Sequence, residues 1–279
     1  MMNRNDKVFR IVGIACTCLG LLLLALFLAD IIRQGAGRLS GSFLTNLPSR
    51  FPERAGIYTA LVGSFYILVL TALMAVPVGI GAGLYLEEYA KKNWLATLVE
   101  INILNLAGIP SIIYGLLGLG MFVQTLHWGS SVLSAAATLA LLVLPTIIVA
   151  TREAVKAVPN SIREASYGLG ATHWQTVWLQ VLPAAMGGIT TGVILALLRA
   201  VGEAAPLVAI GVLAYVPFAP TSPFDAFSAL PTQIFNWIDR PQVGFRAAAA
   251  AAIIVLLSVT FLLNGLAIYL RSRWQQNRS

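Results

Sequence analysis

The chain has 279 residues, of which 58% are hydrophobic and only 10% are charged, with a formal net charge of +7. Soluble domains carry roughly 25% charged residues, so this composition excludes an ordinary soluble protein and indicates an integral membrane protein. Basic residues beside an anionic membrane surface explain the net charge, and nucleic-acid binding need not be invoked.

The N-terminal segment predicts a first membrane helix that is not cleaved. Three basic residues precede an uncharged run over 11–29. About 20 apolar residues span a bilayer, whereas a signal peptide has a shorter apolar region and a small-residue cleavage site. Cys16 and Cys18 lie within this run, and we interpret them as small packing side chains rather than a disulfide framework or metal ligands.

Uncharged runs predict six spans in one transmembrane domain. Gly79 and Gly83 lie in the second span at small-xxx-small spacing, which favours close helix packing. The uncharged run between Glu100 and Arg152 is too long for one span, and we divide it at the turn 127–131. Within the domain 1–279, the predicted spans are about 8–32, 57–85, 95–121, 131–150, 187–212 and 247–270.

Motifs for chemistry are absent from the sequence. There is no Gly-x-x-x-x-Gly-Lys-Ser/Thr phosphate loop, no nucleophile elbow, no His-Glu-x-x-His and no paired-cysteine motif. His127 stands beside Trp128 at the predicted turn and is interpreted as an interfacial side chain, not a ligand or base. We therefore expect a non-catalytic chain without metal or cofactor, and any energy from ATP would have to enter from another chain.

The basic residues predict the orientation of the spans. Cytoplasmic loops carry an excess of Lys and Arg. With both termini inside, eleven of the 18 basic residues fall on the cytoplasmic side and six outside, and Arg199 lies within the membrane. The cytoplasmic set is Arg4, Lys7, Arg10, Lys91, Lys92, Arg152, Lys156, Arg163, Arg271, Arg273 and Arg278.

Residues 161–183 form a polar segment between two apolar runs. Two pairs have the capping-box spacing and so predict two short helices, separated by glycines at 168 and 170. These pairs are Ser161 with Glu164, and Thr172 with Gln175. Pro183 predicts a bend before the next span, because it cannot donate to the helical ladder.

This segment resembles the EAA loop of bacterial ABC importer permeases. The likeness rests on Glu164-Ala165-Ser166, Gly170-Ala171 and Leu182-Pro183, with Ser166 in place of the usual Ala and Gln180 where an aliphatic residue is common. It implies an all-α fold of the type I importer permeases, with a cytoplasmic coupling helix in the loop 151–186 between helices 4 and 5. The residues implied to contact the ATPase are Glu164, Ala165, Ser166, Gly170 and Ala171. An ordinary capped amphipathic helix remains the alternative.

Arg199 and Glu203 stand out within the fifth predicted span. Arg199 lies about 18 Å along a helix from Gly187, near the middle of the bilayer, where a charge is costly and usually functional. Glu203 is one turn further on the same face and can pair with it. Pro206 removes the N–H that would bond the carbonyl of Gly202. The pair is interpreted as lining a translocation path, and a helix-packing ion pair remains the alternative.

Two stretches sharpen the resemblance to the A-type permease of the phosphate-specific ABC importer. They are Arg199-Ala200-Val201-Gly202-Glu203-Ala204-Ala205-Pro206-Leu207 and Ala107-Gly108-Ile109-Pro110-Ser111-Ile112-Ile113-Tyr114-Gly115, and the similarity covers about 56–274. It implies that Pro110, Ser111, Arg199 and Glu203 line the path. It also implies an inner-membrane complex with a second, related permease, an ATP-binding subunit dimer and a periplasmic phosphate-binding protein. Permeases for sulfate or molybdate carry a similar Arg-x-x-Gly-Glu and remain an alternative.

The predicted external loop 213–246 carries a short amphipathic helix. Asp225 is expected to cap this helix over 225–238, with its apolar face against the membrane or the neighbouring helices. Gln233, Asn236 and Arg240 are expected to face the periplasm near the binding protein.

Two other classes of membrane protein fit less well. A secondary transporter commonly has more spans and interrupted helices in matching halves, which the sequence does not indicate. A membrane enzyme needs a reactive constellation at an interface, whereas Arg199 and Glu203 are deep and few.

Overall fold

The computed structural model describes residues 4–91, 93–211 and 215–276. This part of the chain consists of helices and connecting loops, and its one β-pairing is an isolated bridge between Ser131 and Ala226. The long elements are α1 (Arg4–Gly35), α3 (Tyr58–Leu84), α4 (Trp94–Ala107), α6 (Val132–Lys156), α9 (Leu182–Gly202) and α12 (Val243–Gln276). The short ones are η1 (Ala36–Arg38), α2 (Gly41–Thr45), η2 (Tyr85–Tyr89), α5 (Ser111–Gly118), η3 (Leu119–Thr125), α7 (Asn160–Gly168), α8 (His173–Thr176), η4 (Val177–Val181), α10 (Ala205–Ala209) and α11 (Leu230–Ile238).

Five helices of the described chain are long and apolar enough to cross a membrane. They are Val8–Arg38, Tyr58–Tyr89, Val132–Lys156, His173–Gly202 and Val243–Tyr269. A sixth span is formed if α4 and the continuous α5–η3 helix count together, and these two are bent by 102° relative to each other. The fold is therefore all-α with five or six spans.

Helix α6 lies at the centre of the bundle, and 72% of the residues in its most apolar 18-residue stretch are buried. Its neighbours α3 and α9 approach closely because small residues face it. A Cβ added at Gly79 or Gly83 of α3 would stand 2.6 Å from Ile147 or Thr151 of α6. The predicted small-xxx-small packing is thus confirmed, and the contact is one in which packing rather than water exclusion stabilises helix pairs.

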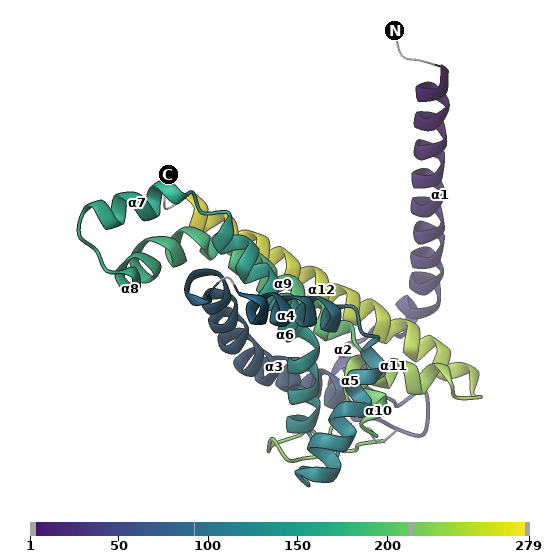
Figure 1. Cartoon of the computed structure of the whole chain (residues 1–279). Coiled ribbons are helices and arrows are strands. Elements are labelled where there is room, and N and C mark those ends of the chain that lie inside the picture. The colour runs from purple at the N-terminus through teal and green to yellow at the C-terminus, as the bar shows by residue number, and fades with distance from the viewer. Residues whose placement is uncertain (1–3, 92, 212–214, 277–279) are drawn as a thin grey trace.

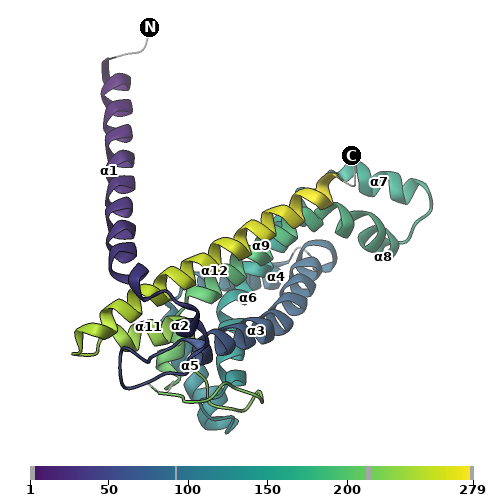
Figure 2. The same cartoon turned by 180° about the vertical axis from the view of Figure 1, so that it is seen from behind.

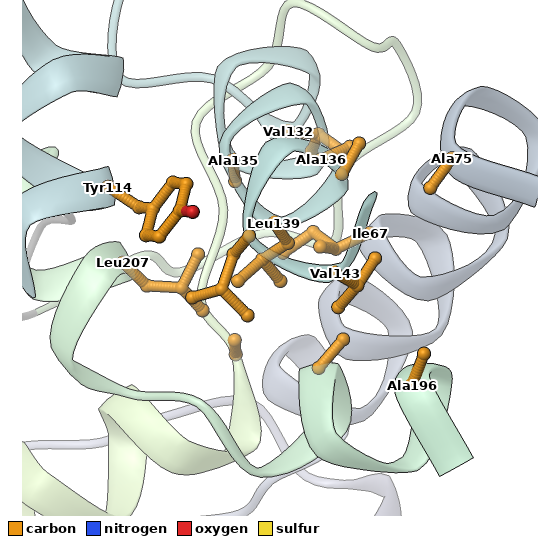
Figure 3. Packing of buried hydrophobic residues seen from close by; sticks show 14 of the residues in the cluster. Ile67, Ala75, Tyr114, Val132, Ala135, Ala136, Leu139, Val143, Ala196 and Leu207 are labelled. Atoms are coloured by element: carbon orange, nitrogen blue, oxygen red, sulfur yellow. The ribbon is translucent and has the colours of Figure 1, made fainter. Parts of the chain in front are cut away.

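The largest core cluster joins α3, α5, α6, α9 and α10. Leu139 and Val143 of α6 project between Ile67 of α3 and Leu207 of α10, and Tyr114 of α5 closes one side (Figure 3). Three alanines of α6 belong to the same cluster and let the backbones approach: Ala135, Ala136 and Ala140. This cluster fixes α10 against α5, which brings two sequence motifs 90 residues apart into one region.

Helix α1 stands apart from the bundle. In both views it extends away from the other helices and meets α12 only near its C-terminal end (Figures 1 and 2). In its most apolar 18-residue stretch, no residue is buried. At Gly35, by contrast, α1 approaches the backbone of α12 so closely that an added Cβ would stand 2.6 Å from Ala250.

Two predicted spans differ from the structure. The third is not one straight helix over 95–121: α4 ends at Ala107 and α5 begins at Ser111, because Pro110 disfavours helical geometry in the residue before it. The fifth does not run to residue 212: α9 ends at Gly202, where Glu203 adopts an extended conformation (φ −78°, ψ 114°). Both breaks lie within apolar runs, so hydropathy alone did not predict them.

Candidate coupling surface and translocation path

Helices α7 and α8 form a hairpin (residues 160–176) at one end of the bundle, beside the C-terminal end of α12 (Figure 1). The N-terminus of α7 differs from the prediction. The helix begins at Asn160 after Pro159 and has no side-chain cap, so the predicted capping box of Ser161 with Glu164 is wrong. Pro159 starts the helix instead, since its fixed φ suits the position before the first turn.

The turn between α7 and α8 has the hydrogen bonds of a Schellman motif. The N–H of Ala171 donates to Ser166 O at 3.2 Å and that of Gly170 donates to Tyr167 O at 2.9 Å. Gly170 has φ +81°, with no atom within 4 Å of an added Cβ. A side chain there is therefore disfavoured by backbone strain and not by obstruction.

The second predicted capping box is confirmed. Thr172 Oγ1 accepts from Gln175 N at 3.3 Å, and Gln175 Oε1 accepts from Thr172 N at 2.8 Å. This box begins α8 directly after the left-handed turn. The two signals together reverse the chain within five residues, which is why the hairpin is compact.

Ser166 holds the two helices of the hairpin together. Its hydroxyl and that of Thr176 share a hydrogen bond of 2.8 Å, and both residues are buried. The serine that departs from the usual Ala of the EAA pattern therefore has a partner on α8. A buried hydroxyl pair of this kind contributes about 1 kcal/mol.

The hairpin and the following turn η4 line an open concavity with a volume of about 650 Å³. Four of the five predicted coupling residues line it, and Glu164 lies exposed outside it. Large apolar side chains stand around the concavity, with Leu169 90% and Leu179 67% exposed. An exposed apolar patch around a concavity is typical of a protein-binding surface. The lining residues are Ile162, Ala165, Ser166, Leu169, Gly170, Ala171, Gln175, Leu179 and Gln180.

Helix α8 continues into the membrane span as part of one helix from His173 to Gly202, and the bend expected at Pro183 stays a prediction. The π-helical turn η4 joins α8 to α9, and Pro183 lies in the first turn of α9. A π-helical turn supplies the local adjustment that a proline requires. Helix α8 of the hairpin is thus the first part of a 30-residue helix, His173–Gly202, which at 1.5 Å per residue is about 45 Å long.

The break between α4 and α5 and the end of α9 at Gly202 lie close together, at the end of α9 away from the hairpin. We call residues 107–111 and 199–206 the elbow region. Tyr114 of α5 donates to Leu106 O of α4 at 2.8 Å, across the 102° bend. A Cβ at Gly115 would stand 2.6 Å from Pro206, so α5 and α10 are in backbone contact. The two motifs predicted for the path are therefore brought together.

Arg199 and Glu203 form the predicted ion pair. Arg199 Nε lies 3.3 Å from Glu203 Oε1, and the two side chains are 45% and 18% exposed. The pairing does not require helical continuity, because Glu203 follows the end of α9. Within the elbow region Pro110 is exposed and Ser111 is half-buried.

The loop before α11 is held by Asp225. Its Oδ2 accepts from the N–H groups of Thr221 and Ser222, both at 2.8 Å, and from Thr221 Oγ1 at 3.0 Å. These hydrogen bonds lower the pKa of Asp225. Asp225 therefore stabilises a turn and does not cap the helix. Its own carbonyl accepts from Val132 N at 3.1 Å, which fastens this loop to the start of α6.

Helix α11 is more buried than predicted. Gln233 is 2% exposed and accepts a hydrogen bond from Ser228 at 3.0 Å, so its expected position on an outer surface is wrong. Asn236 and Arg240 are half-buried, and the Arg240 guanidinium lies 4.4 Å from the Phe245 ring. The helix is buried because its apolar residues pack against α12 and α3 on both sides.

Two functional candidates escaped the sequence reasoning. Tyr114 was part of a quoted motif without a role, and of the pair Glu88 and Arg163 only Arg163 was considered, as a cytoplasmic charge. Glu88 lies 2.6 Å from Arg163 although the two are 75 residues apart. A polar residue in an apolar motif could have indicated Tyr114, whereas no local signal marks a pairing at such separation.

Comparison with known proteins places the chain in a family. Residues 75–276 match the family described as "Binding-protein-dependent transport system inner membrane component". A probable ABC transporter permease of Bacillus subtilis, YqgI, is 33% identical, covering 98% of this chain and 96% of the relative. The phosphate transport system permease protein PstA of Yersinia pestis is 31% identical, covering 95% and 89%. These relatives confirm the resemblance drawn from the motifs.

The fold agrees with solved importers. A bacterial ABC transporter involved in the import of the acidic polysaccharide alginate superposes with a TM-score of 0.67 at 15% identity, covering 97% of this chain and 96% of that chain. At this identity the match shows the fold alone. The matched region 75–276 establishes that the chain belongs to the family of binding-protein-dependent transport system inner membrane components.

Proposed function

We propose that this chain is a membrane-spanning permease subunit of an ATP-driven phosphate importer, in which the elbow region lines half of the path and the α7–α8 hairpin receives a separate ATPase. The observation that carries the proposal is the exposed Arg199–Glu203 pair at the meeting of two interrupted helices. Relatives described as phosphate transport permeases supply the substrate class.

Membrane physics supports a watery elbow region. A backbone that leaves helical geometry at membrane depth is tolerated only where protein covers it or where it faces a water-filled cavity. Helix α4 spans about 21 Å before it breaks after Ala107, which is within the thickness of the hydrocarbon core. The charged pair beside this break needs the same surroundings. A second permease facing the elbow region would complete the path.

The chemistry of the pair suits an oxyanion in transit. The Arg199 guanidinium presents a planar fork of donors that stays charged when desolvated. Glu203 holds it at 3.3 Å between passages and, being negative, weakens anion binding enough for release. At neutral pH phosphate keeps a proton that Glu203 can accept as a hydrogen bond, whereas sulfate has none to offer.

The hairpin surface supports docking of an ATP-binding subunit. Its concavity is lined by exposed Leu169 and Leu179, and the hairpin continues through η4 into α9. We propose a complex with a second related permease, two ATP-binding subunits and a periplasmic phosphate-binding protein. The complex would lie in the bacterial inner membrane with both termini and the hairpin cytoplasmic, and Asn236 and Arg240 toward the binding protein.

The test is uptake of radiolabelled phosphate into proteoliposomes that contain the complete complex. We expect uptake that requires ATP and the binding protein and that survives an excess of sulfate or molybdate. Full competition by sulfate or molybdate would move the substrate class to another oxyanion. Uptake without ATP would instead identify a secondary transporter.

A further inference from the structure

The end of α3 is fastened to the α7–α8 hairpin through Glu88 of η2. Glu88 Oε1 accepts from Arg163 Nη2 at 2.6 Å and from Arg163 Nε at 3.2 Å. The two side chains are only 7% and 15% exposed. Two donors on one carboxylate oxygen, away from water, make a more directional contact than an exposed ion pair.

Arg163 joins a third element to this contact. Its Nη1 donates to Val158 O at 2.7 Å and its Nη2 donates to Val155 O at 3.1 Å. Val155 belongs to the last turn of α6, where carbonyl groups have no partner within the helix. One guanidinium therefore binds the end of α6 and the end of α3 while its backbone belongs to α7.

His173 connects the other half of the hairpin to the same point. Its Nε2 lies 3.1 Å from the backbone carbonyl oxygen of Glu88, and its Nδ1 lies 2.8 Å from the Tyr167 hydroxyl. Its ring meets Tyr89 edge-on at 4.7 Å. Helices α7 and α8 thus both contact η2.

The chain connectivity makes this contact important. Helix α6 is joined to α7 by residues 157–159, so movement of the hairpin reaches α6 through the backbone. Helix α3 lies far earlier in the chain and contacts the hairpin through side chains. The η2 contact therefore joins α3 directly to the hairpin, in addition to the packing of α3 against α6.

We propose that Glu88, with Arg163, is a positioning residue for energy coupling: it transmits displacement of the α7–α8 hairpin to α3 and hence to the packed α3–α6 pair. This inference rests on the proposed function, because it takes the hairpin as the seat of the ATPase. Neutralising Glu88 leaves Arg163 buried without its counter-charge, which loosens the contact. The hairpin then moves without carrying α3.

The experiment measures phosphate transported per ATP hydrolysed in the reconstituted complex, for Glu88→Gln, Arg163→Gln and the double variant. Each single variant is expected to assemble and to retain basal ATP hydrolysis. The amount of phosphate transported per ATP hydrolysed should fall by about fivefold or more, because coupling between two sites typically changes an equilibrium by at least this factor. The double variant should fall no further than the worse single variant, because both changes break one contact.

The matched control is Glu87→Gln. Glu87 lies beside Glu88 on η2 but pairs with Arg152 of α6 at 3.4 Å. Its ratio should stay near that of the wild type. An equal loss in Glu87→Gln, or a wild-type ratio in Glu88→Gln, would overturn the proposal.

Two further measurements distinguish a failure of assembly, or of the proposed function, from a failure of the role of Glu88. If Glu88→Gln does not assemble, the Glu88→Gln, Arg163→Met double variant removes both charges and restores assembly, and a wild-type ratio in it overturns the proposal. Absence of phosphate-stimulated hydrolysis in the wild-type complex would contradict the proposed function. A wild-type ratio of phosphate transported per ATP hydrolysed in every variant would contradict only the role of Glu88.

Discussion

The hairpin end and the elbow region contain the two groups of charged residues that matter most, and they are built differently. At the hairpin, Arg163 binds one carboxylate and two carbonyls and is 15% exposed in its side chain. In the elbow region, Arg199 has a single 3.3 Å contact with Glu203 and is 45% exposed. A satisfied, buried contact transmits displacement, whereas a loosely held exposed charge can exchange its partner for a passing anion.

Close packing near the hairpin should be the most sensitive to change. Gly83→Ala places a Cβ 2.6 Å from Thr151 and 2.9 Å from the backbone oxygen of Ile148. We expect a loss of about 1–3 kcal/mol in stability from overpacking. Thermal unfolding of the purified chain in detergent measures it.

Gly81→Ala is the matched control on the same helix, since no atom lies within 4 Å of its added Cβ. It should be neutral or stabilising by about 0.5–1 kcal/mol, because Ala favours helix over Gly. Equal destabilisation of both variants would show that the α3–α6 contact is not tightly packed.

The Ser166–Thr176 hydrogen bond inside the hairpin gives the next effect. Ser166→Ala leaves a buried hydroxyl on Thr176 without this partner and should cost about 1–3 kcal/mol. The Ser166→Ala, Thr176→Val double variant should regain most of the loss, since both polar groups are removed. A double-mutant cycle of melting curves checks this, and simple additivity would exclude the bond as a stabilising contact.

The elbow pair should contribute little to stability. Glu203→Gln is expected to change the unfolding free energy by less than about 1 kcal/mol, because exposed pairs are weak. Phosphate uptake should nevertheless fall in the same preparation. A large loss of stability would make the pair a packing feature and remove the contrast between the two regions.

Asp225 gives the smallest effect and sharpens the comparison through pH. Because its folded pKa is lowered, the carboxylate stabilises the folded chain above the ordinary Asp pKa, and that contribution is lost as the pH falls through the folded pKa. The melting difference between wild type and Asp225→Asn should therefore be present at pH 7 and shrink below the ordinary Asp value of about 3.9. A difference that grows on acidification would contradict this sign.

Local signals in the sequence predicted much of the fold. Apolar runs, Gly79 with Gly83, and the capping box of Thr172 with Gln175 each act over a few residues, and the structure agrees with them. The break at Gly202 was missed because hydropathy does not distinguish a bent span from a straight one. Burial of Gln233 depends on two distant helices, which no local pattern records.

For the candidate site, motif resemblance located residues that the structure brings together, but it did not reveal how they are held. Tyr114 across the bend and Glu88 beside Arg163 are contacts set by tertiary packing. The motif marked Gly170, and its φ of +81° supplies the physical reason for a glycine there.

The central claim is that energy enters at the hairpin and the anion passes at the elbow region, and one paired measurement tests it. ATP hydrolysis and phosphate uptake are recorded in the same proteoliposomes for Arg199→Gln and for a Glu164→Lys, Gly170→Asp double variant. We expect the Arg199 variant to assemble and hydrolyse ATP but to transport poorly, and the hairpin variant to lose both stimulated hydrolysis and transport. Full transport by Arg199→Gln, or normal stimulation and transport in the hairpin variant, would contradict this division.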